Sequence, residues 1–426
     1  MKVTIIGAGL AGLACARRLT DKNIPVRIIE RSTSVGGRVQ SKTIDGFRID
    51  IGFQVLLNAY PALQLLPELA TLPAYNFPPG ARIMQEHRLH TLSDPFRNPA
   101  DALPSIITPV VSIQDKLLMW HLAAEFNRRP LTSLWDEPDQ TILRFLTRRG
   151  FSNAAIELFF RPFVGGITLD ESLGTSAAIF KFIWSMLSKG IATLPAGGMQ
   201  SIPAAMASAL KKKNVDILLD TQVTGLTKTS NHWDVQTPTE LTESEIVVLA
   251  TDAWSLGGLL PEYNPPKYRS QRCLWLTIDR IVDCGPSLIL NPDRQSPFMT
   301  VAPMHAVDPD RAPKGKSLFA VTVRADHFTD TTDEIVQSFH QAMQRNKVIT
   351  PSDSIACIAD QTVQRAQFVQ DPNHFRSRKP SATLPDGLYV CGEHLLTSSI
   401  NGALESGIAV ADEIVRTLSS KERLWD

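Results

Sequence analysis

Residues 2–40 constrain the fold of this chain more than any other stretch. An apolar run of strand length, Val3–Ile6, is followed at once by Gly7-Ala8-Gly9-Leu10-Ala11-Gly12. In a GxGxxG turn the first glycine allows the tight turn, the second lets backbone approach a pyrophosphate, and the third lets the next helix pack on the sheet. The helix would also direct the positive end of its dipole at the phosphates. The stretch predicts a dinucleotide site that includes Gly7, Gly9, Leu10, Ala11 and Gly12.

A second predicted strand, residues 25–29, ends at Glu30. An acid about 20 residues beyond the glycines is the usual partner of the ribose hydroxyls, and Glu30 stands near that spacing. A glycine-rich turn in an ordinary α/β unit is the alternative, but it would not require a strand, a helix and an acid together. Glu30 is compatible with NAD and with FAD, so this first motif predicts only a dinucleotide.

The composition excludes several classes of protein. The 426 residues include 43 Lys or Arg and 43 Asp or Glu, so the formal net charge is zero and no basic field is available to attract nucleic acid. The cysteines have no CxxC spacing, which argues against a disulfide framework and against a thiolate zinc site. We therefore expect no metal and a reducing, cytoplasmic location.

Targeting and membrane segments are not evident in the sequence. The first strand begins too early to leave room for a signal peptide, and no apolar run of about 18 residues predicts a membrane-spanning helix. The amphipathic stretch 114–128 has two interpretations: packing within a helical layer, or a face turned to lipid or to substrate entry. Peripheral contact with a membrane therefore stays open, and no partner protein is identifiable.

A second glycine motif follows the acid. After Glu30 come Arg31 and, beyond a short loop, Gly36-Gly37-Arg38; an Asp50-Ile51-Gly52 turn then leads to Phe53-Gln54. Paired glycines beside an arginine suit a backbone that approaches phosphate while the guanidinium neutralises its charge. This ExxxxxGGR pattern, after a GxGxxG and before a DxG turn, resembles the flavin-containing amine oxidase superfamily. That group includes monoamine oxidases, protoporphyrinogen oxidases and phytoene desaturases.

The resemblance extends along the chain. Residues 194–206 resemble the family's LPxGGMxxIPxAL stretch. By the family pattern Val223 presents its backbone to the adenine, the strand end at Ala250 and Thr251 lies close to the cofactor, and Gly392-Glu393 meets ribitol and phosphate. Gly52, Phe53 and Gln54 would approach the flavin ring, and the helix that begins with Ile400, Asn401, Gly402 and Ala403 would point at the pyrimidine end of the isoalloxazine. The resemblance thus implies FAD, bound non-covalently, because no cysteine stands in the loop before Gly387.

The expected fold class is α/β. A discontinuous Rossmann-like FAD-binding domain is predicted from residues 1–59, 190–264 and 364–426, and an α+β substrate-binding domain of mixed or antiparallel sheet and helices from residues 60–189 and 265–363. Helices are expected at 114–128, 141–149, 154–163, 177–187 and 334–345. Strands of the later chain are expected at 215–220, 222–226, 272–278, 287–290, 298–302 and 318–323.

The predicted substrate domain supplies apolar side chains. They would line a pocket for a largely apolar small molecule, or form the core of the helical layer: Phe159, Phe160, Phe163, Phe180, Phe182, Trp184 and Met186. The resemblance implies an FAD-dependent oxidoreductase that carries out two-electron desaturation or dehydrogenation, as protoporphyrinogen oxidases and phytoene desaturases do. Only one GxGxxG occurs, so no NAD(P)H site is predicted and oxygen or a quinone is the expected electron acceptor.

Two residues are candidates for the catalytic step. Amine oxidases of the family place a lysine near flavin N5, on the first strand of the returning substrate domain, and Arg272 falls about there. Arginine is a poor base, which disfavours amine oxidation; a strand arginine in a salt bridge is the alternative for this residue. His394 is predicted as an acid, base or flavin contact, or as a side chain that stabilises its turn. Amine oxidation and a flavin-binding scaffold without turnover are the alternative functions.

Overall fold

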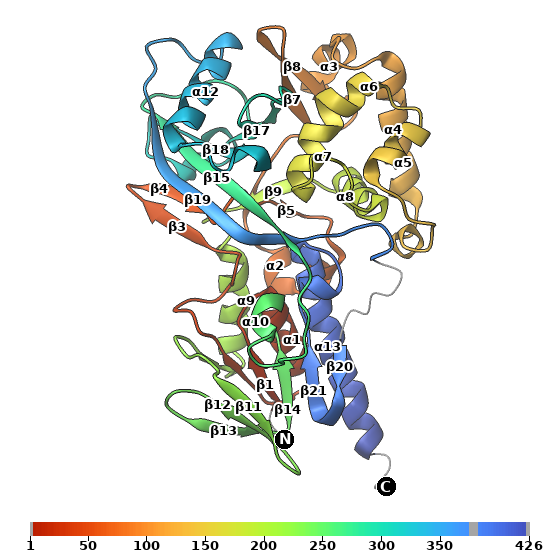
Figure 1. Cartoon of the computed structure of the whole chain (residues 1–426), viewed down its shortest axis with the longest axis vertical. Helices are drawn as coiled ribbons and strands as arrows, with labels where there is room; N and C mark the ends of the chain where they lie inside the picture. Colours follow the sequence, from red (N-terminus) through yellow and green to blue (C-terminus); the bar gives the residue numbers. More distant parts are fainter. Residues whose placement is uncertain (1–2, 375–381, 423–426) are drawn as a thin grey trace.

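The computed structural model describes residues 3–374 and 382–422. The lower half of Figure 1 contains a six-stranded sheet in the order β10-β2-β1-β14-β21-β20. Strands β10 to β21 are parallel and in register, so Ile6 lies beside Ile29 and Leu249, and β20 adds an antiparallel edge. All five parallel strands therefore end at one edge of the sheet. Their bounds are β1 (Val3–Ile6), β2 (Val26–Ile29), β10 (Asp216–Leu218), β14 (Ile246–Leu249), β20 (Ala382–Leu384) and β21 (Leu388–Val390).

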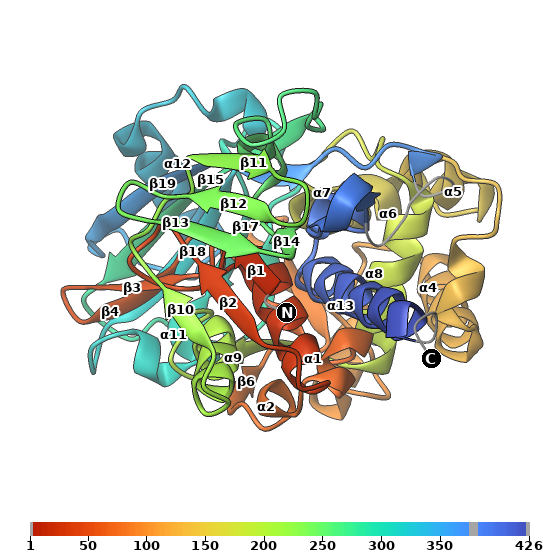
Figure 2. The same ribbon diagram turned by 90° about the horizontal axis from the view of Figure 1, so that it is seen from below.

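The two faces of this sheet have different covers (Figure 2). Ile5 and Ile28 pack against helices, whereas Ile6 and Ile29 pack against a small antiparallel sheet. The alternation follows from the period of a strand, in which successive side chains point to opposite faces. The helices are α1 (Leu10–Thr20), α9 (Ser201–Lys211) and α13 (Ile400–Glu422), and the small sheet comprises β11 (Gly225–Lys228), β12 (Trp233–Gln236) and β13 (Leu241–Ser244).

The upper half of Figure 1 contains a seven-stranded sheet in the order β19-β15-β18-β17-β16-β7-β8. Neighbours are antiparallel except β16 and β7, which makes the sheet mixed, as predicted. Helix α12 (Thr332–Arg345) packs on one face through Ile335, Phe339 and Met343. The strands are β7 (Gly80–Gln85), β8 (Arg88–Ser93), β15 (Tyr268–Ile278), β16 (Leu288–Leu290), β17 (Phe298–Pro303), β18 (Ser317–Val323) and β19 (Ile355–Phe368).

A layer of helices stands beside this sheet at the right of Figure 1. Its core is aromatic: the ring centroids of Phe126 and Phe145 are 6.5 Å apart, those of Phe145 and Phe180 5.7 Å, and those of Phe180 and Phe160 6.0 Å. A capping box in which Ser112 and Asp115 exchange hydrogen bonds starts the longest helix of the layer. The predicted helices all form, as α4 (Ile113–Arg128), α5 (Ile142–Arg148), α6 (Asn153–Ala155) with a π-helical turn (Ile156–Phe160) and α7 (Arg161–Thr168), and α8 (Ala177–Lys189); α3 (Ala102–Ile107) precedes them.

Some expected elements differ from those observed. The predicted strand 222–226 is mostly a loop, since β11 begins only at Gly225. Strands β7 and β8 form before residue 114, where no strand was predicted, and β19 runs across the expected domain boundary at residue 363. The remaining elements are short: β3 (Ser41–Ile44), β4 (Phe47–Asp50), β5 (Leu56–Leu57), β6 (Ala74–Asn76), β9 (Ala192–Pro195), α2 (Pro67–Ala70), α10 (Ala253–Leu256) and α11 (Met304–Val307).

A fully buried ion cluster joins the two halves of the molecule. The guanidinium of Arg311 donates to Asp50 Oδ2 at 2.6 Å and to Asp308 Oδ2 at 3.3 Å, and all three side chains have no exposed surface. Asp50 Oδ1 in turn accepts hydrogen bonds from Ser41 Oγ and from the backbone N–H of Met199. The cluster therefore fixes the end of β4, from which the DxG turn begins.

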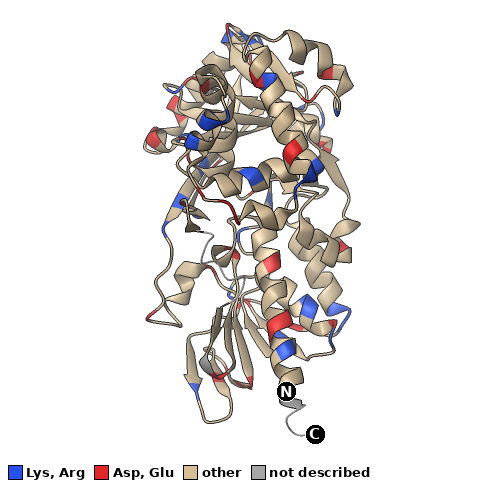
Figure 3. Ribbon diagram, turned by 90° about the vertical axis from the view of Figure 1, so that its right-hand side faces the viewer, with Lys and Arg blue, Asp and Glu red and all other residues tan. Residues whose placement is uncertain are grey.

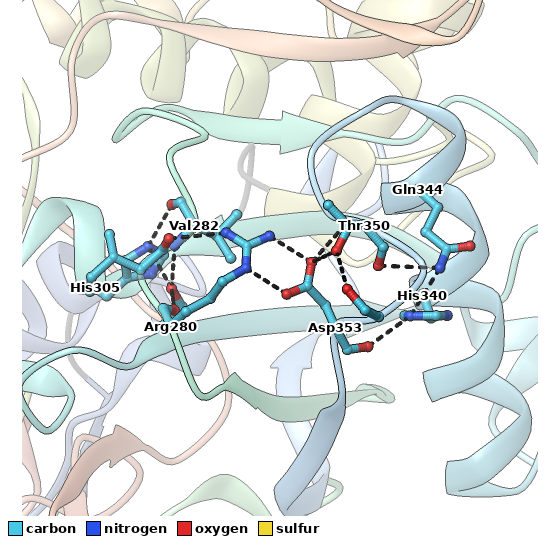
Figure 4. A network of polar contacts seen from close by, with 10 residues as sticks. Arg280, Val282, His305, His340, Gln344, Thr350 and Asp353 are labelled. Atoms are coloured by element: carbon cyan, nitrogen blue, oxygen red, sulfur yellow. Dashed lines mark hydrogen bonds and ion pairs between the residues drawn. The ribbon is translucent and has the colours of Figure 1, made fainter.

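A second polar network closes the far end of the seven-stranded sheet (Figure 4). Arg280 donates two hydrogen bonds to the carboxylate of Asp353, which also accepts from the backbone N–H of Thr350. The neighbouring imidazole of His305 contacts the carbonyl oxygens of Leu318 and Val282. These contacts connect the end of β15 to the beginnings of β18 and β19.

Basic and acidic residues are interspersed over the face drawn in Figure 3. Within residues 3–374 and 382–422, no helix is both long and apolar enough to span a bilayer.

Candidate active site

The parallel register brings the predicted motifs together. Because β1, β2, β14 and β21 end at the same edge, the residues that follow them lie side by side: Gly7, Glu30, Ala250 and Gly392. These residues line one end of a cavity of about 1750 Å³ that continues into the helical layer of the upper half. Ligands of open α/β sheets bind at this edge.

The first glycine turn leaves a cradle at the N-terminus of α1. Gly7 has φ +109°, and a Cβ there would stand 2.7 Å from the Ala250 carbonyl oxygen; a Cβ on Gly12 would stand 2.0 Å from the Gly7 oxygen. Gly9, by contrast, has no atom within 4 Å of its Cβ position, so its backbone borders open space. It is also the N-cap of α1 without a side-chain acceptor. Unpaired N–H groups at a helix N-terminus fit a pyrophosphate.

The second glycine pair lies against the first. Gly36 forms a bridge with Gly9, and its N–H donates to the Ala8 carbonyl at 2.9 Å. Glu30, at the end of β2, is 7% exposed and accepts hydrogen bonds from the N–H groups of Ala8 at 2.7 Å and Ser32 at 2.8 Å. Its carboxylate therefore has a fixed position on the cavity wall. Gly37, Arg31, Val223 and Thr251 complete this part of the lining.

Arg38 and Glu393 form an ion pair across the cavity wall. The Arg38 guanidinium donates to Glu393 Oε1 at 2.6 Å and to the carbonyl oxygens of Arg365 and Ala366. Burial opposes the charge of Arg38, but the Glu393 carboxylate outweighs it and raises the pKa of Arg38. The second carboxylate oxygen of Glu393 is buried without a hydrogen-bond partner. An orphaned acceptor on a cavity wall fits a hydroxyl donor of a bound ligand.

His394 lies next to this pair and is 6% exposed. Burial lowers the pKa of its imidazole, so the neutral form prevails at pH 7. Its Nε2 atom is buried and has no partner. His394 also lines the cavity, which supports the expected ligand contact more than a purely structural role in the turn.

Residues after the DxG turn reach the middle of the cavity. The Gln54 side-chain amide donates to the carbonyl oxygens of Arg38 and Ile51, which fixes the turn, and the Phe53 ring packs edge-on against Phe77 at 6.3 Å. Both residues line the cavity, as do Ile400 and Ala403 at the start of α13. The cradle, the orphaned atoms and the two helix N-termini are together compatible with a dinucleotide that carries a flavin.

Several predicted contacts shape the wall without lining it: Gly12, Gly52, Asn401 and Gly402. Asn401 Oδ1 accepts a hydrogen bond from the Ala62 N–H, so its amide is used inside the protein. A Cβ on Gly402 would stand 2.1 Å from the Thr397 oxygen, and one on Gly52 would stand 2.2 Å from Gln271 Oε1. Glycine is needed for close packing at Gly402, whereas at Gly52 the φ of +70° favours glycine.

The structure places Arg272 in a salt bridge, which was the alternative interpretation of this residue, and not among the residues that line the cavity. Its guanidinium donates to both carboxylate oxygens of Asp360, at 3.0 and 2.6 Å, and to the carbonyl oxygens of Phe328 and Asp330. Arg272 lies on the α12 face of β15, together with Leu274. The preceding residue, Gln271, is on the cavity face, because a shift of one residue along a strand reverses the face.

The apolar residues divide between wall and core. Phe159, Phe163, Phe182 and Trp184 line the cavity, with the rings of Phe159 and Phe163 stacked at 5.3 Å. Phe160, Phe180 and Met186 are buried in the core of the layer instead. We call the part of the cavity lined by Phe159, Phe163, Ile179, Phe182, Trp184 and Leu187 the apolar chamber.

Sequence reasoning missed the contribution of β19. Gln364, Arg365 and Gln367 line the cavity from this strand, and Gln370 follows it. Polar residues stand on both faces of β19, so no alternation of apolar and polar residues reveals a strand there. For Gln271 a signal did exist: Leu274, Leu276 and Ile278 share one face of β15, and Gln271 falls on the other.

Comparisons with known proteins agree with this geometry. A family model described as flavin-containing amine oxidoreductase matches residues 10–415. A protoporphyrinogen oxidase 2 of Arabidopsis thaliana is 26% identical over 167 residues, which are 39% of this chain and 32% of that protein. A 4,4'-diapophytoene desaturase of Staphylococcus aureus is 38% identical over 69 residues, 16% of this chain and 12% of the desaturase. The chain thus matches a third or less of the length of these relatives.

A solved oxidoreductase from Methanosarcina mazei has a similar fold. The two structures superimpose with a TM-score of 0.73 over 97% of this chain and 100% of that chain, at 17% sequence identity. At this identity the likeness concerns the fold alone.

Proposed function

Because this chain belongs to the family of flavin-containing amine oxidoreductases, we propose that it binds FAD non-covalently and removes two electrons from a largely apolar small molecule. The single observation that carries the proposal is the continuous cavity. It joins a cradle suited to a dinucleotide to a chamber lined by apolar side chains. A ligand in the chamber would thus meet the end of the cofactor that lies beyond Arg38 and Glu393.

The charges of the cavity favour an uncharged substrate. Among the described lining residues the carboxylates are Glu30, Asp94, Asp252 and Glu393, and none of them lies in the apolar chamber. An amine cation would lack a counter-charge there, and burying an unpaired charge is costly. Desaturation or dehydrogenation of a neutral compound fits this lining better than amine oxidation. The partial relatives, a diapophytoene desaturase and a protoporphyrinogen oxidase, are consistent with that choice.

The residues of the chain would bind and orient the cofactor and the substrate, and flavin, when bound, would supply the hydride and electron chemistry. The N-terminus of α1 would hold the pyrophosphate, and Glu30 would accept hydrogen bonds from ribose hydroxyls. Glu393, held by Arg38, would accept from a hydroxyl of the ribitol chain, and the N-terminus of α13 would stabilise negative charge at the pyrimidine end. Gln271 and neutral His394 would add no charge of their own to the lining, which would suit an apolar substrate.

Flavin binding and substrate class can be tested in one preparation. Titration of the purified protein with FAD should saturate one site, and Glu30→Gln should weaken binding at least about tenfold, since charge-assisted hydrogen bonds contribute roughly 1.5–3 kcal/mol. Glu243→Gln, an exposed carboxylate on β13, is the matched control. An anaerobic screen that follows flavin absorbance then compares a polyene, a porphyrinogen and an amine.

Each outcome separates the candidate functions. Bleaching by the polyene or the porphyrinogen supports the proposal, and reoxidation by oxygen or by a quinone identifies the acceptor. Bleaching by the amine alone would replace the proposed function with amine oxidation. Binding without reduction by any compound indicates a flavin-binding scaffold, and the absence of FAD binding rejects all three.

A further inference from the structure

The entrance of the cavity carries an unusual concentration of exposed apolar side chains. Between residues 96 and 120, seven large apolar side chains are each more than half exposed, and we call them the apolar rim: Phe96, Leu103, Ile106, Ile107, Ile113, Leu117 and Trp120. Single exposed apolar residues need no explanation, but a contiguous patch of several hundred Å² indicates an interaction site.

Helices α3 and α4 carry most of the apolar rim, and their other sides are anchored in the protein. Leu103, Ile106 and Ile107 stand at i, i+3 and i+4 on α3 and share one face. On α4, Ile113, Leu117 and Trp120 also share a face, while Leu122 and Phe126 are buried in the core. The ring of Phe96 lies 6.3 Å from that of Trp120, which joins the preceding loop to the patch. The rim is therefore one surface.

This surface lies at an opening of the cavity. Five rim residues line the cavity although they are more than half exposed: Phe96, Ile106, Ile113, Leu117 and Trp120. The residues of the apolar chamber line the same cavity. An apolar ligand can thus pass from the rim to the chamber along apolar side chains. A compound that prefers such a path partitions into a bilayer, so an entrance that faced water would require it to cross an aqueous gap.

Two cations are held in place at the border of the rim. Lys116 Nζ donates to the carbonyl oxygens of Ile106 and Thr108 at 2.9 and 2.8 Å, and the Arg97 guanidinium donates to the carbonyl oxygens of Leu187 and Gly190. The nearby carboxylate of Asp94 accepts hydrogen bonds from the backbone N–H groups of Phe96 and Arg97. Apolar side chains with fixed cations beside them match an anionic membrane, in which the apolar interior lies next to a layer of negatively charged headgroups.

We infer that the apolar rim docks on one leaflet of a bilayer that contains anionic lipids, and that the substrate enters the chamber from the lipid. That the molecule entering from the lipid is the substrate rests on the proposed function, whereas the docking itself depends only on the apolar rim. No helix of the described residues is both long and apolar enough to span a bilayer. A second copy of the chain seated on the rim is the competing occupant.

The test is co-flotation of the FAD-loaded protein with phosphatidylcholine vesicles, with and without phosphatidylglycerol. The double variant Leu103→Gln/Ile107→Gln changes rim residues that do not line the cavity, and it should lower the partition coefficient about tenfold or more. The control Leu241→Gln/Ile281→Gln alters equally exposed apolar residues elsewhere and should float like the unmodified protein. High salt should weaken the phosphatidylglycerol-dependent part.

Three results would overturn the inference: no flotation, equal loss in both double variants, or a dimer in size-exclusion chromatography that the rim variant dissociates while vesicles leave it intact. Flotation requires no turnover, so its failure is distinct from failure of the proposed reaction. If vesicles bind and no apolar compound reduces the flavin, the docking stands and the proposed function falls.

Discussion

Removal of the Arg311 guanidinium should destabilise this protein more than removal of any exposed arginine. Arg311→Met keeps an apolar side chain of similar length but leaves Asp50 and Asp308 buried beside each other without a cation. Both carboxylates lie in a site with no exposed surface, and burial already raises the pKa of Asp308 above its usual value. The variant must therefore bury uncompensated charge or take up a proton.

The expected cost is about 3–5 kcal/mol, the loss seen when one partner of a buried pair is removed. With a urea dependence of about 3 kcal/mol per M, the unfolding midpoint should fall by about 1–1.7 M. Trp275, which is fully buried and packs in the same core as β4, allows the transition to be followed by fluorescence. The control is Arg18→Met, which removes an exposed pair with Asp412 and should cost about 0–1 kcal/mol.

A triple variant separates charge from packing. Adding Asp50→Asn and Asp308→Asn to Arg311→Met removes every charge of the cluster while leaving acceptors for Ser41, Met199 and Asp310. Replacing a whole buried ion cluster is often close to neutral, so the triple variant should regain much of the lost stability. A midpoint for Arg311→Met equal to that of Arg18→Met, or a triple variant weaker than the single one, would refute this reasoning.

Other consequences can be measured in the same way. Hydrogen bonds from Arg280 hold the pKa of Asp353 far below its unfolded value of about 3.9. The stability that this carboxylate contributes is therefore present above about pH 4 and is lost as the pH falls below that value. Urea midpoints measured from pH 5 to pH 3 should fall more steeply for the unmodified protein than for Asp353→Asn. Burial raises the pKa of Cys391 to about 12 and that of Cys357 to about 11. At pH 8 and before urea is added, an aromatic disulfide reagent should therefore label only the half-buried Cys357, and should do so slowly. Rapid labelling of Cys391 would contradict its buried position. Arg272→Met should lower the urea midpoint and leave the absorbance of bound flavin unchanged, whereas Gln271→Leu should shift that absorbance. A shifted absorbance in Arg272→Met together with an unchanged one in Gln271→Leu would instead place Arg272 at the cavity.

The cofactor half of the site was predictable because its requirements are local. Gly7, Gly9 and Gly36 stand where backbone must turn tightly or approach closely, and each belongs to a short motif of fixed spacing. The orientation of a strand is a different problem. Arg272 and Gln271 are adjacent, and only the packing of Leu274 against α12 decides which of them faces the cavity.

Long-range pairing was beyond the sequence argument. Strands β7 and β8 precede the rest of their sheet by about 180 residues of chain, and β7 joins it beside β16. Strand β19 carries glutamine and arginine because one face borders the cavity and its outer edge is not covered by another strand, so its composition does not resemble that of a core strand. Such positions are set by tertiary contacts, which override local propensity.

The order of strands in the six-stranded sheet has a consequence for synthesis of the chain. Strand β1 (Val3–Ile6) pairs with β14, which in turn pairs with β21 (Leu388–Val390), and helix α1 (Leu10–Thr20) packs against α13 (Ile400–Glu422). Gly407 of α13 approaches α1 so closely that a Cβ there would stand 2.1 Å from the Ala11 oxygen. At ~5–20 residues per second, roughly 20–80 s separate the emergence of the two helices from the ribosome. During that interval the face of α1 that packs on α13 lacks its partner, so the glycine motif reaches its final environment only after residues 400–422 have been made.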